Sequence, residues 1–340
     1  MSSSIRPGGE TPNDFLQIDQ LLTDEERLIR DTVREFVGDK VLPDIAEWFE
    51  AGTFPKELAK EMGALGLFGM HLEGYGCAGT NAVSYGLACT ELEAGDSGVR
   101  SFVSVQGSLA MYPIWAFGSE EQKERWLRPM ARGELLGAFS LTEADAGSDA
   151  AAITAQATRD GDGWRLNGSK MWVTNGASAD IVLMMVRTDD PEDRKGSRGI
   201  GAFLVPTEAD GYIPGRKERK MGLRGSETVS VTLQDLRLGP EHLIGEPGLG
   251  FRYALELLGK RTSMPPLGLL TVAAMFPESW ELRLADLNVE PLQDSALEWA
   301  DLVLTSTMVV QQRSLREVLA RCSASGKPVA VGGPHPPSFG

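Results

Sequence analysis

Apolar residues recur at helical spacing in the first third of the chain. The first such run follows Thr23, and Glu26 stands three positions later, which is the arrangement of a capping box. Ile29, Val33 and Phe36 then fall on one face of a helix. An amphipathic helix is therefore predicted to begin at this position.

The same spacing predicts further helices before about residue 130. They follow Pro55, cover residues 81–94 and 99–117, and run from Ser119 to Met130. Residues 19–133 are predicted to form an all-α domain. Residues 1–18, which are polar and contain Pro and Gly, are predicted to be a disordered tail.

After Gly133 the helical spacing gives way to alternation. Strands are predicted at residues 155–158, 164–166, 181–186, 202–205 and 229–233. Turn sequences such as Asp160–Gly163 separate them. Residues 134–248 are therefore predicted to form an antiparallel β domain, with the charged segment 189–201 as a surface loop.

Beyond Phe251, short runs that favour strands alternate with helical patterns. The strand-like runs cover residues 281–289, 301–310 and 327–333, and the helical ones cover residues 294–300 and 314–326. Such alternation is typical of parallel strands joined by crossover helices. The predicted fold is thus multi-domain: a helical domain, an antiparallel β domain, and a partial Rossmann-like α/β fragment over residues 251–340.

Charge narrows the range of partners. The chain has 33 basic and 48 acidic side chains, a formal net charge of −15, which repels nucleic acid and anionic membranes. The N-terminal sequence lacks the apolar core of a signal peptide, and no later apolar run is long enough to span a bilayer. Neither nucleic acid nor a membrane is expected as a partner, and a cytoplasmic location is expected.

Cysteine and histidine residues are few and scattered, which argues against a disulfide framework, an iron–sulfur centre or another metal site. No metal is therefore expected. The residues are Cys77, Cys89, Cys322, His71, His242 and His335.

Three segments carry the most specific chemistry. The first motif is Phe139-Ser-Leu-Thr-Glu-Ala-Asp-Ala-Gly-Ser-Asp149, the second is Asn167-Gly-Ser-Lys-Met-Trp-Val-Thr-Asn175, and the third is Met221-Gly-Leu-Arg-Gly-Ser-Glu-Thr228. In order and separation they resemble the flavin-binding middle domain of the acyl-CoA dehydrogenase family. The resemblance implies FAD as cofactor and an acyl-CoA thioester as substrate.

The resemblance also implies roles for single residues. Thr142 and Thr174 would donate hydrogen bonds to the flavin, Trp172 would pack beside it, and Ser148 would lie between the flavin and the thioester. Hydroxyl groups and an indole suit a ring with polar edges and a flat apolar face. An edge strand with a Gly turn is the alternative for residues 147–149. The full implied cofactor set is Phe139, Leu141, Thr142, Gly147, Ser148, Trp172, Val173 and Thr174.

Residues 98–106 resemble the helix that faces the far end of the acyl chain in glutaryl-CoA dehydrogenases. Arg100 and Ser101, with Ser148, are the implied substrate-binding residues. A guanidinium in an apolar pocket is costly unless it meets a carboxylate, which a glutaryl group supplies. The alternative is that Arg100 is a solvated or ion-paired residue near Asp96.

Members of this family remove an α proton with a carboxylate while a β hydride moves to the flavin. Their base is a glutamate of a C-terminal four-helix domain, to which residues 252–340 show no similarity. That domain is therefore expected to be absent, and no catalytic residue is assigned. Glu143 is not assigned as a base merely because it lies in the first motif.

The last ninety residues resemble part of the cobalamin-binding-type domain of certain radical S-adenosylmethionine proteins, at residues 253–260, 264–274, 285–291 and 327–334. An Asp-x-His-x-x-Gly run and a three-cysteine cluster are missing, so cobalamin is not expected as a cofactor. Gly332 and Gly333 either line a ligand at a strand end or form a turn.

Three functional hypotheses remain at this point. The first is a FAD-dependent, glutaryl-CoA-dehydrogenase-like oxidoreductase that is catalytically incomplete. The resemblance implies electron-transfer flavoprotein as its electron acceptor, and members of the family are homotetramers. The second is a non-catalytic fusion or misjoined product that holds flavin weakly. The third is a corrinoid-binding module attached to an inactive dehydrogenase.

Overall fold

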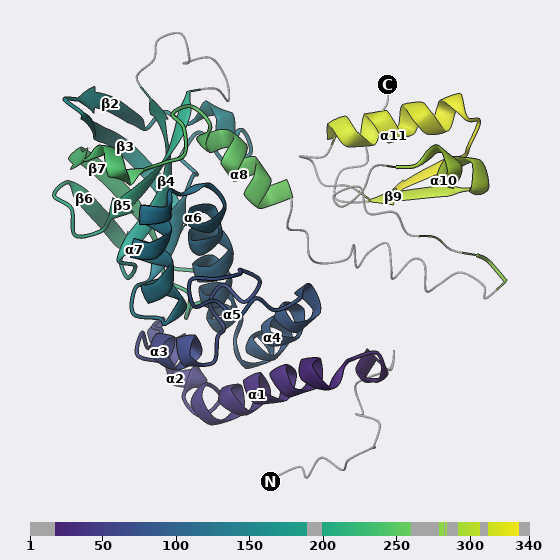
Figure 1. Ribbon diagram of the computed structural model, residues 1–340, viewed down its shortest axis with the longest axis horizontal. Helices are drawn as coiled ribbons and strands as arrows, with labels where there is room; N and C mark the ends of the chain where they lie inside the picture. The colour runs from purple at the N-terminus through teal and green to yellow at the C-terminus, as the bar shows by residue number, and fades with distance from the viewer. Residues whose placement is uncertain are drawn as a thin grey trace. The chain divides into compact units, whose positions relative to one another are not determined.

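The computed structural model describes residues 18–188, 199–259, 279–281, 283, 292–306 and 312–332. The chain divides into two compact units, Met1–Leu257 and Leu258–Gly340, each of which is described by itself (Figure 1). The predicted tail up to residue 17 and most of the charged loop, residues 189–198, lie outside the described residues.

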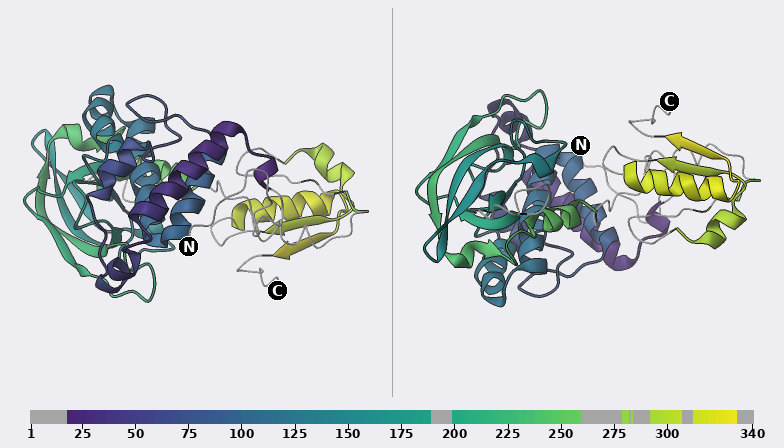
Figure 2. Two further views of the ribbon diagram at one scale, coloured as in Figure 1. Left: turned by 90° about the horizontal axis from the view of Figure 1, so that it is seen from below. Right: turned by 90° about the horizontal axis from the view of Figure 1, so that it is seen from above.

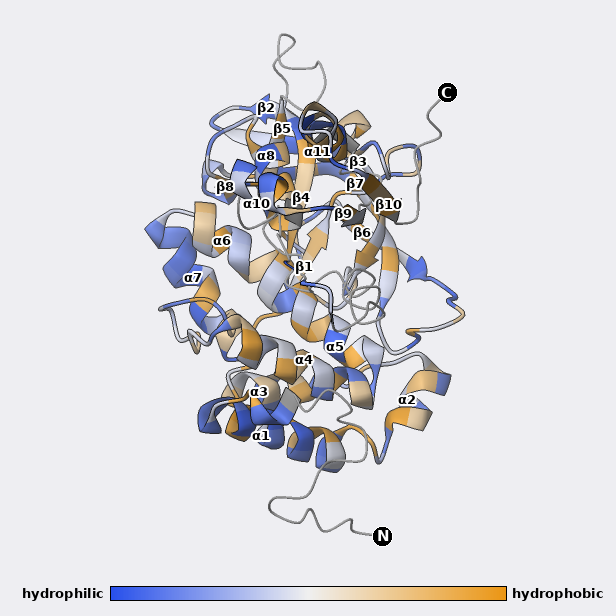
Figure 3. Ribbon diagram, turned by 90° about the vertical axis from the view of Figure 1, so that its right-hand side faces the viewer, coloured by the Kyte–Doolittle hydropathy of each residue, from blue (hydrophilic) through white to orange (hydrophobic). Residues whose placement is uncertain are grey.

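The first unit begins with the predicted helical domain. The predicted capping box is confirmed, because the Glu26 amide donates to Thr23 Oγ1 over 3.2 Å. A second capping box begins the helix predicted from Ser119, where the Gln122 amide donates to Ser119 Oγ over 3.2 Å. In Figure 3, α1 carries both hydrophilic and hydrophobic residues, as its spacing predicts. The helices are α1 (Asp24–Lys40), α2 (Ile45–Ala51), α3 (Leu58–Ala64), α4 (Ala82–Gly95), α5 (Ser97–Ser104), α6 (Tyr112–Phe117) and α7 (Glu120–Ala131).

The predicted helix over residues 99–117 is interrupted by a π-helical segment, η2 (Val105–Met111), between α5 and α6. Two neighbouring residues of this segment make close contacts with other parts of the chain. A Cβ on Gly107 would come within 2.9 Å of the Gly69 amide, so the backbones meet closely here. The buried Gln106 side chain donates to the carbonyls of Met130 (3.1 Å) and Leu135 (2.9 Å). Helix spacing alone does not reveal such a local change of hydrogen bonding.

Gln106 also reaches the β domain, because its Oε1 accepts the Gly137 amide over 2.6 Å. One buried side chain thus satisfies backbone groups of α7, of the following turn and of the first strand. It fixes how the helical domain leads into the sheet.

The strands of the sheet lie side by side in the order β6-β7-β3-β2-β4-β5-β8. β1, the first strand along the chain, lies off this path and pairs with β4. Its neighbours are antiparallel except for β1–β4 and β2–β4, which are parallel. Figure 2 shows the strands as a curved wall with helices packed on one side. The strands are β1 (Gly137–Ser140), β2 (Gln156–Asp160), β3 (Gly163–Thr174), β4 (Ile181–Thr188), β5 (Ile200–Pro206), β6 (Tyr212–Lys217), β7 (Thr228–Leu238) and β8 (Leu243–Ile244).

The five predicted strands correspond to β2, β3, β4, β5 and β7, which confirms the β domain. β1, β6 and β8 were not predicted. β6 contains Pro214 and Gly215, and Tyr212 is its one buried residue, so it lacks the alternation of a half-buried strand. β8 has only two residues, and β1 is buried at three of its four positions and so does not alternate.

The chain stays with this unit beyond the predicted boundary at residue 248. In α8 (Gly250–Gly259), Tyr253 and Ala254 join the hydrophobic core, and the Tyr253 ring stacks on Phe117 with ring centroids 4.1 Å apart. The Tyr253 hydroxyl accepts the Glu246 amide over 3.2 Å. The stretch from Tyr253, grouped by its sequence with the C-terminal fragment, therefore packs in the first unit up to Leu257.

The second unit contains α10 (Asp294–Trp299), β9 (Val303–Ser306), α11 (Gln312–Ala324) and β10 (Val329–Gly332). β9 and β10 pair in parallel and α11 connects them in sequence, so the predicted alternation of strand and helix is present. Leu297, Val318 and Cys322 form its small core. Residues 264–274, 285–291, Gly333 and His335 lie outside the described residues. Within the described parts of both units, no helix combines the length and apolar character needed to cross a membrane.

We expect Gln106→Leu to lower the free energy of unfolding by at least about 2 kcal/mol, because it removes the side-chain partner of the Leu135 carbonyl and of the Gly137 amide. The Met130 carbonyl loses one hydrogen bond but still accepts the Gly133 amide over 3.1 Å. Urea unfolding followed by circular dichroism measures this change. Gln156→Leu, at an exposed position of β2, is the control and is expected to change little. Equal stability of the two variants would contradict the role given to Gln106.

Candidate functional site

The first and second motifs lie side by side in the sheet. The Met171 amide donates to the Thr142 carbonyl over 2.8 Å, and Lys170 Nζ donates to the Leu141 carbonyl over 3.0 Å. Leu141–Thr142 therefore runs next to the end of β3, so Thr142 and Trp172 belong to adjacent segments. Thr174, two residues further along β3, pairs with Thr228 at the end of the third motif.

The backbone at Trp172 has an unusual conformation. Its φ is +59°, and that of Asn175 is +62°, both in the left-handed region that disfavours residues other than Gly. The pairing of β3 with β7 shifts register between Lys170 and Val173, so Trp172 sits in a β-bulge. Its indole is 56% exposed, whereas Val173 is buried in the core. Strained backbone of this kind often marks a ligand site.

The remaining residues of the first motif form a turn beyond Thr142. Glu143 and Ala146 exchange backbone hydrogen bonds of 3.1 and 3.2 Å, and Gly147 and Ser148 follow at the surface. A Cβ on Gly147 would lie 4.0 Å from Cγ2 of Thr142, so the turn folds back next to that threonine. Phe139, Leu141, Thr142 and Thr174 are half-buried.

A buried ion pair connects the first and second motifs. Lys170 Nζ is 2.7 Å from Glu143 Oε1, and the two side chains are 0% and 6% exposed. The Glu143 carboxylate also accepts the Thr154 amide (2.6 Å), the Thr154 hydroxyl (2.8 Å) and the Ala155 amide (3.0 Å). The ion pair thus links the first motif, the second motif and the start of β2.

The protonation of this pair follows from its surroundings. Burial by itself raises the pKa of Glu143, but the Lys170 ammonium and the hydrogen bonds outweigh burial and hold this pKa below its usual value. Burial lowers the pKa of Lys170 to about 8, although Glu143 opposes the shift. A carboxylate that is ionised, buried and already bonded to four donors is not available to remove a substrate proton, which supports leaving Glu143 unassigned as a base.

Arg187 of β4 braces the same loop from the other side. Its Nε donates to the Ile153 carbonyl over 2.6 Å, its Nη2 donates to the Ala151 carbonyl, and its backbone amide donates to the Ala155 carbonyl over 2.7 Å. Sequence reasoning identified neither Arg187 nor Lys170 as important. The sequence signal that could have identified them is a charged residue at an inward-facing position of a strand that is otherwise apolar.

Arg100 lies on α5 and has a partner. Its Nε is 2.6 Å from Glu93 Oε2, and its Nη1 is 3.5 Å from Ser104 Oγ, with the side chain 34% exposed. The ion pair therefore forms with Glu93 rather than with Asp96, whose carboxylate caps α5 by accepting the Gly98 amide over 2.7 Å. Ser101 is half-buried beside it. Substrate binding by Arg100 and Ser101 stays a prediction.

A small cavity joins α5 to the end of β3. It has a volume of about 200 Å³, and its lining includes Phe102 of α5, Asn175, and Glu227 of the third motif. The helix implied for the substrate and the strand implied for the flavin are thus neighbours within one compact unit. Asn175 Nδ2 is buried and has no hydrogen-bond partner in the described part of the chain.

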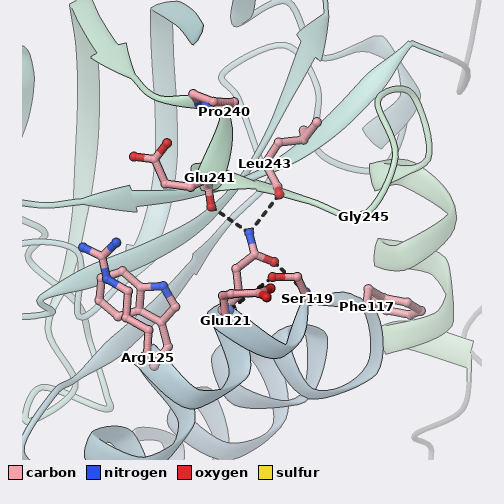
Figure 4. A pocket seen from close by; sticks show the side chains of 11 residues that line it. Phe117, Ser119, Glu121, Arg125, Pro240, Glu241, Leu243 and Gly245 are labelled. Carbon is pink, nitrogen blue, oxygen red and sulfur yellow. Dashed lines mark hydrogen bonds between the residues drawn. The ribbon is translucent and has the colours of Figure 1, made fainter. Parts of the chain in front are cut away.

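A larger cavity of about 520 Å³ lies elsewhere, between α7 and the segment around β8 (Figure 4). Gln122 crosses its wall and donates to the carbonyls of Glu241 and Leu243 over 2.8 and 2.9 Å. Neither cavity is lined by Thr142, Ser148, Trp172 or Thr174. Of the predicted flavin residues, Gly147, Ser148 and Trp172 are exposed, whereas Val173 is buried in the core.

The side chains of these two neighbouring segments are of the types that suit a flavin. Two half-buried hydroxyl groups, of Thr142 and Thr174, and one exposed indole, of Trp172, offer polar partners for a ring edge and an apolar surface for a ring face. Within the described ranges, no three His, Cys, Asp or Glu side chains come together in a way that would hold a metal ion.

Comparison with known proteins agrees with this chemistry. Residues 23–134 match the sequence profile "Acyl-CoA dehydrogenase, N-terminal domain", and residues 138–236 match "Acyl-CoA dehydrogenase, middle domain". The mitochondrial short-chain specific acyl-CoA dehydrogenase of Rattus norvegicus is 37% identical over 238 residues, which are 70% of this chain and 57% of that protein. The chain thus spans just over half the length of this curated relative.

Solved structures give the same result. A glutaryl-CoA dehydrogenase from Mycobacterium smegmatis in complex with FADH2 is 50% identical, with a TM-score of 0.66, over 72% of this chain and 62% of that one. Butyryl-CoA dehydrogenase from Megasphaera elsdenii is 34% identical, with a TM-score of 0.67, over 90% of this chain and 81% of that one. None of these comparisons supports the cobalamin-type resemblance of residues 251–340. The chain belongs to the acyl-CoA dehydrogenase family, whose N-terminal and middle domains it contains.

Proposed function

We propose that the first unit binds FAD on the face formed by the first and second motifs and acts as part of a flavin-dependent acyl-CoA oxidoreductase. The observation that carries this proposal is the backbone pairing of Thr142 with Met171, which brings two sequence-distant motifs into one surface. The FADH2 complex of the Mycobacterium smegmatis relative, at 50% identity, supports the choice of cofactor.

The chain's own residues would orient the cofactor and exclude water from one side of it. Thr142 and Thr174 would hydrogen-bond to the ring edge, Trp172 would cover the ring, and Ser148 would face the thioester. Bound FAD would accept the hydride that leaves the β carbon of the acyl group.

For the substrate we propose a short acyl-CoA that ends in a carboxylate, such as glutaryl-CoA. Arg100 uses Nε for Glu93, and its guanidinium has further N–H groups with which to hold a second carboxylate. Because Glu93 neutralises part of the charge and keeps the guanidinium oriented, the arrangement suits reversible binding. The curated short-chain relative marks the alternative, an acyl chain without a terminal carboxylate.

Proton removal is a separate matter. We propose that the described residues bind flavin and substrate without supplying the base. Glu143 is the buried carboxylate of the motifs, and it cannot act as the base because it already accepts hydrogen bonds from four donors. Electron-transfer flavoprotein is the acceptor implied by the resemblance. A corrinoid function is not proposed, since a β-α-β unit occurs in many unrelated folds.

Purified full-length protein should bind FAD, and anaerobic addition of glutaryl-CoA distinguishes binding from catalysis. Loss of the flavin absorption band would show that the base is present. A flavin band that shifts without bleaching is the result expected for binding alone. A protein that retains no FAD at saturating concentration would overturn the proposed function.

Arg100→Gln is expected to weaken glutaryl-CoA binding by about 10- to 100-fold, the usual loss for one charge-assisted hydrogen bond, and to leave butyryl-CoA binding nearly unchanged. Isothermal titration of the FAD-loaded protein measures both affinities. Arg132→Gln, which breaks a surface ion pair with Glu134, is the matched control. Equal losses for the two ligands would argue against recognition of the terminal carboxylate.

A further inference from the structure

We propose that Glu143 and Lys170 are positioning residues for the flavin: their buried ion pair fixes the two motif segments that would contact the cofactor. This inference rests on the proposed flavin binding and adds the residues that set its geometry. Neither side chain is accessible to a ligand on the surface. Both therefore act through the backbone that they hold.

The segments that would contact the flavin have little support of their own. Trp172 is exposed and sits in a bulge, and Gly147 and Ser148 lie at the surface. Hydrogen bonds of neighbouring buried residues are what can hold them in place. The Lys170 ammonium, two residues before Trp172, donates both to the Leu141 carbonyl and to Glu143.

Lys170 belongs to the second motif and bonds directly to the first. It precedes Met171, whose amide bonds to Thr142, and its own side chain bonds to the carbonyl of Leu141. Backbone and side chain of neighbouring residues thus hold the same two-residue stretch. A shift of Thr142 relative to Trp172 would break both hydrogen bonds at once.

Glu143 closes the loop that carries Ser148. Its backbone pairs with Ala146 at the start of the turn, and its carboxylate binds the amides of Thr154 and Ala155 at the far end of the loop. Residues 143 and 155 are therefore held together, with the turn between them. The turn can present Ser148 in one place because its two ends are fixed.

The use of charged groups here has a physical reason. A buried ion pair contributes little net stability compared with apolar side chains of similar size, since both charges lose hydration. Apolar replacements, however, offer no donor to the Leu141 carbonyl and no acceptor for three donors of residues 154 and 155. The pair provides directional bonds, and direction is what a contact surface for a flat ring requires.

The test uses the full chain with the double variant Glu143→Gln/Lys170→Met, which removes both charges together and leaves no isolated buried ion. The affinity for FAD is measured by quenching of flavin fluorescence, and the visible circular dichroism of the bound flavin reports its orientation. We expect at least about 10-fold weaker binding, equivalent to 1.4 kcal/mol, and an altered flavin dichroism. Far-ultraviolet circular dichroism verifies the fold.

Leu92→Ala is the matched control, because it truncates a fully buried side chain of α4, outside both motifs and the loop between them. It is expected to lower the melting temperature while leaving FAD affinity within about two-fold and the flavin dichroism unchanged. If this control weakens FAD to the same extent as the double variant, the effect is general destabilisation and the positioning role is wrong.

Thr154→Val provides a second measurement if the double variant fails to fold. It removes the hydroxyl that donates to Glu143 over 2.8 Å and keeps the ion pair. We expect FAD affinity to fall by about two- to five-fold, as for one weakened hydrogen bond. Unchanged affinity and dichroism in this variant would overturn the inference, whereas absence of FAD binding in the wild-type chain would overturn the proposed function itself.

Discussion

The arrangement of the two motifs in the β domain depends on one charged ammonium group that is buried away from water. Lys170 has no exposed surface, and burial shifts its pKa to about 8. Its charge is tolerable because a carboxylate lies 2.7 Å away and a carbonyl lies 3.0 Å away. Those two partners belong to the first motif, so the electrostatic requirement of one strand determines the path of another segment.

A similar principle joins the helical domain to the sheet. Gln106 satisfies backbone groups from α7 to β1, and the apolar core continues from Val33 of α1 to Val231 of β7. Because one core serves both domains, the helix that carries Arg100 and the strand that carries Thr174 keep a fixed relation. The candidate substrate and cofactor residues depend on this shared packing and not on direct contact with each other.

Much of this architecture could be predicted from the sequence, because the signals are local. Thr23 with Glu26 and Ser119 with Gln122 begin helices where their spacing predicts, and the alternating runs become strands. Features set by distant contacts could not be predicted. The partners Glu143 and Lys170 are 27 residues apart, the π-helical segment depends on a close approach to Gly69, and Tyr253 joins the first unit by stacking on Phe117. The motifs identified two segments that the structure places side by side, but the hydrogen bonds that hold them together were visible only in three dimensions.

The left-handed backbone at Trp172 sets folding stability against the flavin contact that we propose for its indole. Glycine adopts such a conformation without strain, whereas any side chain there raises the free energy of the folded state. A search for more stable sequences would therefore favour losing the indole, and with it the surface offered to a ring. A higher melting temperature is thus a poor guide to ligand binding at this residue, and engineering for stability should leave position 172 unchanged.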